Sequence, residues 1–199
     1  NSVKYYWSLG YEDNKGNVIG ERYNSVRSLL KLESEVTKWL TVGINSTFSS
    51  RNEGYVPVNI DQYRTNSPYG SRYQDDGITL RYSTTDDPVS SIAPDYDRHF
   101  ITRRSVIRTW TNNLFAKVKL PFNVEYNMDF APRFEYAEFM NHQSALHQEW
   151  GKKGGLAERN NSSLYGWEMN HIVRWNKTMN DIHRFEVTLL ANAEKRQSW

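Results

Sequence analysis

The stretch from Thr109 to Ala131 reads TWTNNLFAKVKLPFNVEYNMDFA and decides the fold. In its second half apolar residues alternate with polar ones, the apolar set being Phe122, Val124, Tyr126, Met128 and Phe130. Successive side chains of a strand point to opposite faces, so this alternation predicts a strand with one apolar and one polar face. Trp110–Leu120 repeats the alternation more loosely, and Lys119–Pro121 leaves room only for a tight turn. The stretch therefore predicts an antiparallel hairpin.

The same alternation recurs along most of the chain and predicts an all-β fold, an antiparallel meander of about seven strands. The expected strands are at about residues 3–12, 22–34, 39–50, 103–119, 122–131, 164–177 and 183–195. Two long loops, 50–102 and 132–163, separate some of them. Within the second loop we expect a short helix over Tyr136–Trp150, because Phe139, Leu146 and Trp150 recur near one helical face.

Composition excludes a helical membrane protein but not a membrane barrel. Of the 199 residues, 38% are hydrophobic and 14% are Phe, Trp or Tyr, so aromatic residues on alternating positions carry much of the apolar content. No run approaches the roughly 20 apolar residues that a transmembrane helix needs, whereas a strand crosses a bilayer in about 9–11 residues with only every second one apolar. The mean hydropathy of −0.79 is therefore compatible with membrane strands.

Charge and cysteine content exclude some binding partners and some kinds of site. The formal charge of +2 is small, and Lys and Arg are scattered without a run, so we expect no nucleic-acid partner. The absence of cysteine excludes disulfides and thiolate metal sites. The chain begins NSVKYYWSLGY, which is neither a signal peptide nor an initiator methionine, and both ends fall in strand patterns. We therefore expect a piece of a longer chain.

The lengths of the connections favour a membrane barrel. The turns at 35–38, 119–121 and 178–181 fall on one side of the meander and are tight, while 12–20 and the two long loops fall on the other. Outer-membrane barrels have short periplasmic turns and longer extracellular loops. Seven strands would leave two unpaired edges, so we expect a segment of a large transmembrane barrel. The alternative is a soluble β-sandwich carbohydrate-binding module, whose apolar faces would meet in a closed core.

Local motifs resemble one family of barrels. Tyr5–Tyr11 reads YYWSLGY and is followed by Asp13 and Gly16, and Val36–Gly43 reads VTKWLTVG. These motifs, with the ending His183–Glu194, resemble barrel strands and turns of the SusC/RagA family of TonB-linked outer-membrane receptors. The resemblance extends from end to end of the chain, but the family's plug and its TonB-contacting segment have no counterpart in it.

The resemblance implies a function as well as a fold. It implies a barrel in the bacterial outer membrane, surrounded by lipid, that imports glycan fragments or peptides. A lipoprotein partner of the SusD type would cap the extracellular face, and TonB would act through regions outside this chain. It implies neither an enzyme nor a cofactor.

The residues themselves indicate no catalytic or metal site. His142 and His147 are five positions apart, which is not the spacing of a helical zinc pair, and a surface loop accounts for them. No Gly-x-Ser-x-Gly motif and no evident pairing of a nucleophile with a base occurs.

Aromatic residues of the long loops are the candidates for substrate binding. Rings of this kind stack on sugars or pack against peptides. The candidates are Tyr55, Tyr63, Tyr69, Tyr73, Tyr82 and Trp150. In the alternative interpretation these rings pack the loops on each other or on the partner protein.

Overall fold

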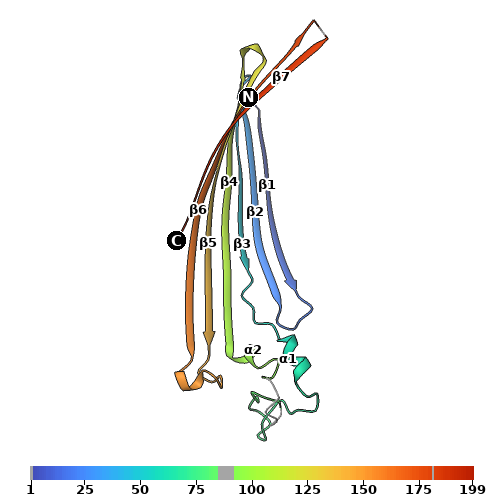
Figure 1. The fold of residues 1–199 in the computed structure, drawn as a ribbon, viewed down its shortest axis with the longest axis vertical. Helices are drawn as coiled ribbons and strands as arrows, with labels where there is room; N and C mark the ends of the chain where they lie inside the picture. The colour runs from blue at the N-terminus through green and yellow to red at the C-terminus, as the bar shows by residue number, and fades with distance from the viewer. Residues whose placement is uncertain (1, 85–91, 181) are drawn as a thin grey trace.

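The computed structural model describes residues 2–84, 92–180 and 182–199, and its strands form one sheet (Figure 1). Every strand pairs with its neighbour in chain order, and each pair is antiparallel. The strands are β1 Val3–Lys15, β2 Arg22–Thr37, β3 Leu40–Asn52, β4 Ile101–Leu120, β5 Val124–Gln143, β6 Leu156–Met179 and β7 His183–Ser198. The predicted all-β antiparallel meander of seven strands is confirmed.

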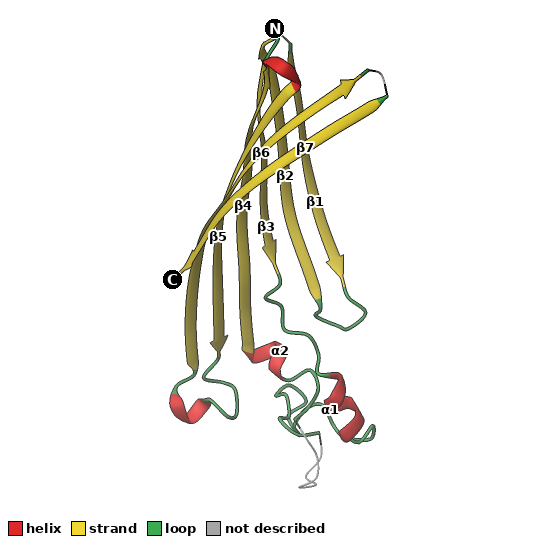
Figure 2. Cartoon of the chain, turned by 45° about the horizontal axis from the view of Figure 1, so that its top comes forward, coloured by secondary structure: helices red, strands yellow, loops and turns green. Residues whose placement is uncertain are grey.

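The sheet is a single layer, as Figure 2 shows. Large apolar side chains such as Trp7, Leu114 and Leu189 are exposed along it. In the part of the chain that the structure describes, the buried apolar residues all lie at or near the loop end, and they are Val58, Ala93, Tyr96, Ile101 and Val106. The alternative of a soluble β-sandwich is therefore wrong, because the apolar strand faces meet no second sheet among the described residues.

The strand register sorts the side chains into two faces, because directly paired residues point to the same side of a sheet. One row across the sheet is Ile44, Leu114, Phe130 and Met169. A second row, toward the long loops, is Phe48, Trp110, Phe134 and Tyr165. We call this second row the aromatic row and the side that carries both rows the apolar face. The opposite side, the polar face, carries residues such as Asn45, Lys117, Asn127, Asp129 and Asn170.

The connections are unequal at the two ends of the sheet. The tight turns β2–β3, β4–β5 and β6–β7 lie at one end, and the hairpin loop 16–21 and both longer loops lie at the other (Figure 1). We call the second end the loop end. The helices α1 (Ile60–Thr65) and α2 (Asp97–Phe100) and the 3-10 turn η2 (Gly151–Lys153) lie there. No helix among the described residues is long and apolar enough to cross a bilayer.

The predicted start of the fifth strand at Phe122 is wrong by two residues. Pro121–Asn123 forms the 3-10 turn η1, in which Phe122 has φ 66° and Asn123 has φ 60°. A tight hairpin connection needs backbone in the left-handed region, so Phe122 joins the turn although its parity matches the strand. Phe122 is 86% exposed.

The predicted loop 132–163 and the helix over Tyr136–Trp150 are also wrong. Strand β5 continues to Gln143 and β6 begins at Leu156, so the loop comprises only residues 144–155. Beyond the aromatic row both faces of these strands carry polar residues, and the hydrophobic period therefore ends while the backbone pairing continues. Pro132 adds to the misreading, because it has no N–H to donate, and the β4–β5 pairing skips Asn112 and Asn113 opposite it.

Candidate functional site

The two longer loops share a small core at the loop end, which we call the loop core: Tyr82, Tyr96, Phe100 and His147. The ring of Tyr96 lies 5.2 Å from those of Tyr82 and His147 and 4.6 Å from that of Phe100. The backbone N–H of Ser144 donates to the carbonyl of Phe100 at 2.8 Å. These contacts hold the loop 144–155 against the segment that precedes β4.

His147 is the polar centre of the loop core, with 2% of its surface exposed. Its Nδ1 accepts from the backbone N–H of Glu149 at 3.2 Å, so that nitrogen carries no proton. The other nitrogen, Nε2, lies 3.2 Å from Oδ1 of Asp97 and donates to it. His147 therefore links two loops, a structural role that its predicted surface-loop position does not capture.

The two tyrosines of the loop core are held in their protonated forms. Burial, and then the hydrogen bond that the hydroxyl donates to Glu149, raise the pKa of Tyr82. Burial also raises the pKa of Tyr96, whose hydroxyl accepts from the backbone N–H of Gln148 at 3.3 Å. Both hydroxyls therefore serve as fixed hydrogen-bonding groups of the loops.

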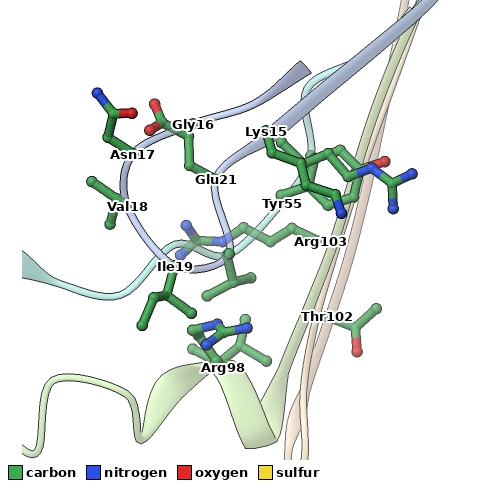
Figure 3. Close-up of a pocket in the computed structure, with 15 residues that line it drawn as sticks. Lys15, Gly16, Asn17, Val18, Ile19, Glu21, Tyr55, Arg98, Thr102 and Arg103 are labelled. Atoms are coloured by element: carbon green, nitrogen blue, oxygen red, sulfur yellow. The ribbon is translucent and has the colours of Figure 1, made fainter. Parts of the chain in front are cut away.

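A pocket of about 520 Å³ lies beside the hairpin loop 16–21, and we call it the rim pocket (Figure 3). The hairpin loop, the segment 54–56, helix α2 and the start of β4 enclose it. Gly20 has φ 87°, and a Cβ there would lie 2.6 Å from Nε of Arg98. Only glycine therefore lets the hairpin loop close over Arg98.

The charge of the rim pocket is predominantly positive. Lys15, Arg22, Arg98 and Arg103 line it together with one acidic residue, Glu21. Arg22 donates two hydrogen bonds of 2.8 and 2.7 Å to the carboxylate of Asp13. Neither Lys15 nor Arg98 has an ion-pair partner within the described ranges. The pocket thus offers free cations beside apolar walls that include Ile19 and Val56, an arrangement suited to a ligand with an acidic group.

The structure distributes the six predicted binding rings over different surroundings. Tyr55 lines the rim pocket, but its hydroxyl accepts from Nδ2 of Asn24 at 2.8 Å and of Asn52 at 3.3 Å. Asn24 and Asn52 are paired across β2 and β3, and their side chains lie on the apolar face. Tyr55 therefore lies over that face. Tyr82 belongs to the loop core, and Lys153 lies 5.0 Å from the ring of Trp150.

The other three rings belong neither to the rim pocket nor to the loop core. Tyr63 on α1 is 56% exposed, Tyr69 is 96% exposed, and Tyr73 is close to its neighbour Arg72. Within the part of the chain that the structure describes, none of the six rings stacks on another of the six. The structure therefore brings them to one end of the sheet but does not join them into a single platform.

Sequence reasoning missed Arg98, Gly20 and Tyr96. Arg98 and Tyr96 lie in or beside α2, a helix of only four residues that no hydrophobic period announces. Gly20 is the one of the three that the sequence signals, since a glycine near the end of a short hairpin loop commonly marks left-handed backbone.

Comparisons with known proteins point in one direction. No protein-family model matches the chain. The TonB-dependent receptor P39 of Formosa agariphila is 27% identical over 201 residues, which cover 98% of this chain and 18% of that receptor. Two solved structures of the RagAB peptide importer, in its closed-closed and open-open states, match with a TM-score of 0.69 at 13% and 14% identity. Each match covers 98% of this chain and 24% of the importer chain.

The chain thus spans less than a quarter of these proteins, while almost all of it takes part in the match. The receptor is similar in sequence, and the importer is similar in fold. Both similarities agree with the motifs at Tyr5–Tyr11 and Val36–Gly43. By sequence and by fold, the chain is therefore similar to a stretch of the β-barrel of a SusC/RagA-like TonB-dependent receptor.

Proposed function

We propose that this chain forms part of the barrel wall of an outer-membrane TonB-dependent importer, with the apolar face toward lipid and the polar face toward the lumen. The observation that carries the proposal is a single-layer antiparallel meander. Its apolar face is bounded by aromatic side chains both toward the loop end and toward the tight turns. The aromatic row bounds it toward the loop end, and Tyr126 and Trp175 lie near the tight turns.

The height of the apolar face fits a bilayer. Phe134 of the aromatic row and Val124, which pairs with Trp175, are ten positions apart on β5. At about 3.4 Å per residue, and with a strand tilt of about 40°, that distance corresponds to roughly 25 Å along the membrane normal. Outer-membrane barrels carry an apolar band of about this height between two aromatic girdles.

The loop end would then face the cell exterior, and the tight turns would face the periplasm. One matched protein is named a TonB-dependent receptor and the other a peptide importer. We infer a cargo of oligosaccharide or peptide, a surface lipoprotein partner of the SusD type at the loop end, and contact with TonB through regions outside this chain. The role is transport and not catalysis.

The loop 53–100 and the rim pocket are the parts that we assign to the cargo or to the partner. The exposed rings of Tyr63 and Tyr69 offer stacking surfaces, and the free cations Lys15 and Arg98 favour an acidic group, such as a uronate or a peptide carboxylate.

Two neighbouring substitutions on β5 test the facing in the full-length receptor. Met128 lies on the apolar face near mid-height, and Asn127 lies on the polar face beside it. Arginine facing lipid at the bilayer midplane costs about 2–4 kcal/mol, while lumen positions tolerate charge. We expect Met128→Arg to reduce the assembled barrel and Asn127→Arg to leave it near the wild-type amount, both measured by heat-modifiable gel mobility. Equal losses from the two variants would contradict the facing.

A further inference from the structure

Beyond the aromatic row, the apolar face carries an arginine cluster: Arg104, Arg108 and Arg159 around Glu138. We propose that this cluster binds the phosphate of an anionic lipid in the outer leaflet, a site that goes beyond the proposed importer function and rests on its assignment of the apolar face to lipid.

The register places the cluster directly above the membrane-facing rows. Arg108 pairs with Tyr136, which is the next pair on the same face beyond that of Trp110 and Phe134. Arg104 pairs with Met140, which pairs in turn with Arg159 on β6. All three arginines therefore point to the apolar face, at the depth where an aromatic girdle gives way to lipid headgroups.

The cluster surrounds one buried carboxylate and contains more guanidinium groups than that carboxylate can neutralise. Glu138 is 9% exposed. Its Oε2 lies 4.0 Å from Nη1 of Arg108, and its Oε1 lies 3.6 Å from Nη2 of Arg159. The side chain of Arg159 is nevertheless 60% exposed, and Arg104 is exposed with no ion pair in the described part of the chain. Two guanidinium groups lie within 4.0 Å of one carboxylate, and Arg104 stands on the same face, so a net positive charge and many N–H donors remain for a ligand.

An apolar pocket adjoins the cluster on the membrane side. It has a volume of about 580 Å³, and Arg108 stands among its lining residues together with the whole aromatic row. The rings of Phe134 and Tyr165 lie 4.9 Å apart within it. A cationic site next to an aromatic pocket matches a molecule with an anionic head and apolar chains.

The chemistry favours phosphate as the head group. A guanidinium group is planar, stays charged and donates two parallel hydrogen bonds to phosphate oxygens. Arginine on a lipid-facing strand is also tolerated near the interface, where anionic headgroups and water reach it, and not at mid-bilayer. The same residues would be unfavourable if this level of the face met hydrocarbon alone.

The test uses the full-length receptor in detergent with two probes, bisphosphorylated lipid A and the same lipid with both phosphates removed, and it measures binding by native mass spectrometry. The variant Arg104→Ala/Arg159→Ala removes two cations while Arg108 continues to pair with Glu138. The matched control, Lys31→Ala/Lys117→Ala, removes two cations from the polar face, where they line another depression. Heat-modifiable mobility first establishes that each variant assembles.

We expect the wild-type receptor to bind the phosphorylated lipid about tenfold more tightly than the other form, and the arginine variant to lose about tenfold or more of that affinity. The lysine control should stay within about twofold of the wild type. If the arginine variant does not assemble, Arg104→Ala alone, which breaks no ion pair among the described residues, should weaken binding by about fivefold.

Three results would overturn the lipid site: unchanged binding in the arginine variant, equal binding of both lipid forms, or loss of a copurifying lipoprotein without loss of lipid. If these occur while Met128→Arg and Asn127→Arg still differ in assembly, the lipid site fails and the importer assignment stands. If the lysine control loses lipid and the arginine variant does not, the polar face meets the membrane, and both proposals fail.

Discussion

At the scale of single residues, His147 holds the loop end in its observed arrangement. It accepts from the N–H of Glu149, donates to Asp97 and packs among the rings of Tyr96 and Phe100. A hydrophobic residue of similar size fills the same volume but makes neither of these two hydrogen bonds. A hydrogen bond contributes about 0.5–1.5 kcal/mol net, so the loss of two is enough to open a loop while the sheet below stays paired.

We therefore expect His147→Leu to raise the rate at which an external protease cuts the loop 144–155 on intact cells by about fivefold or more, a change of about 1 kcal/mol or greater. The amount of assembled barrel should not change. His142→Leu is the matched control, because His142 is exposed on β5 close to the same loop. Equal cutting of the His147 variant and the control would contradict the role of His147.

Some features of the loop end could not be predicted from the sequence, because they depend on contacts between distant residues. Nothing in the spacing of His142 and His147 distinguishes an exposed side chain from a buried one, because Asp97, which binds the ring of His147, lies 50 positions away in the chain. Arg98 reaches the rim pocket only because Gly20 allows the hairpin loop to close over it. Contacts of this kind depend on the folded loops and leave no periodic pattern in the sequence.

At the scale of elements, the sequence predicts strands well where one face is apolar. The cores of β1, β3, β4 and β7 lie within the predicted ranges, because alternation requires one apolar and one polar face. It fails where β5 and β6 rise beyond the aromatic row, since polar residues on both faces hide a strand that backbone hydrogen bonds still maintain. The predicted loop 132–163 is the result of that failure.

A deletion within the remaining long loop, 53–100, tests whether cargo uptake can be lost while the barrel still assembles. The N–H of Asn59 donates to the carbonyl of Pro94 at 3.0 Å, so the chain ends left by removing residues 60–93 lie close together. The deletion keeps the contact between Val58 and Ile19 and the start of β4, but it removes α1 and the four candidate rings between Tyr63 and Tyr82.

We expect a full-length receptor with residues 60–93 replaced by a short Gly-Ser linker to assemble normally and to lose most uptake of its cargo, because binding residues concentrate on loops held by rigid strands. Replacing Gly151–Lys153 by Gly-Ser-Gly, at the tip of the other loop, controls for a general disturbance of the loop end. Unchanged uptake after the deletion would assign cargo binding to other parts of the receptor.

At the scale of the whole molecule, the single sheet requires further strands. Strands β1 and β7 each pair with one neighbour among the described residues, so each has a row of backbone N–H and C=O groups without strand partners. Hydrocarbon cannot satisfy such groups, and closed barrels are the β structures that span membranes. We infer that other strands of the full-length receptor pair with both edges and close the barrel.

The facing of this wall is the central claim, and a labelling scan along β5 tests it most directly. The chain contains no cysteine, so single cysteines at positions 126–134 introduce spin labels without background from these strands. Collisions with dissolved oxygen, which concentrates in the bilayer, report lipid exposure in the full-length receptor reconstituted in vesicles. We predict high oxygen accessibility at 126, 128, 130, 132 and 134 and low accessibility at the positions between them. High accessibility at 127, 129, 131 and 133 instead, or no alternation at all, would contradict the account.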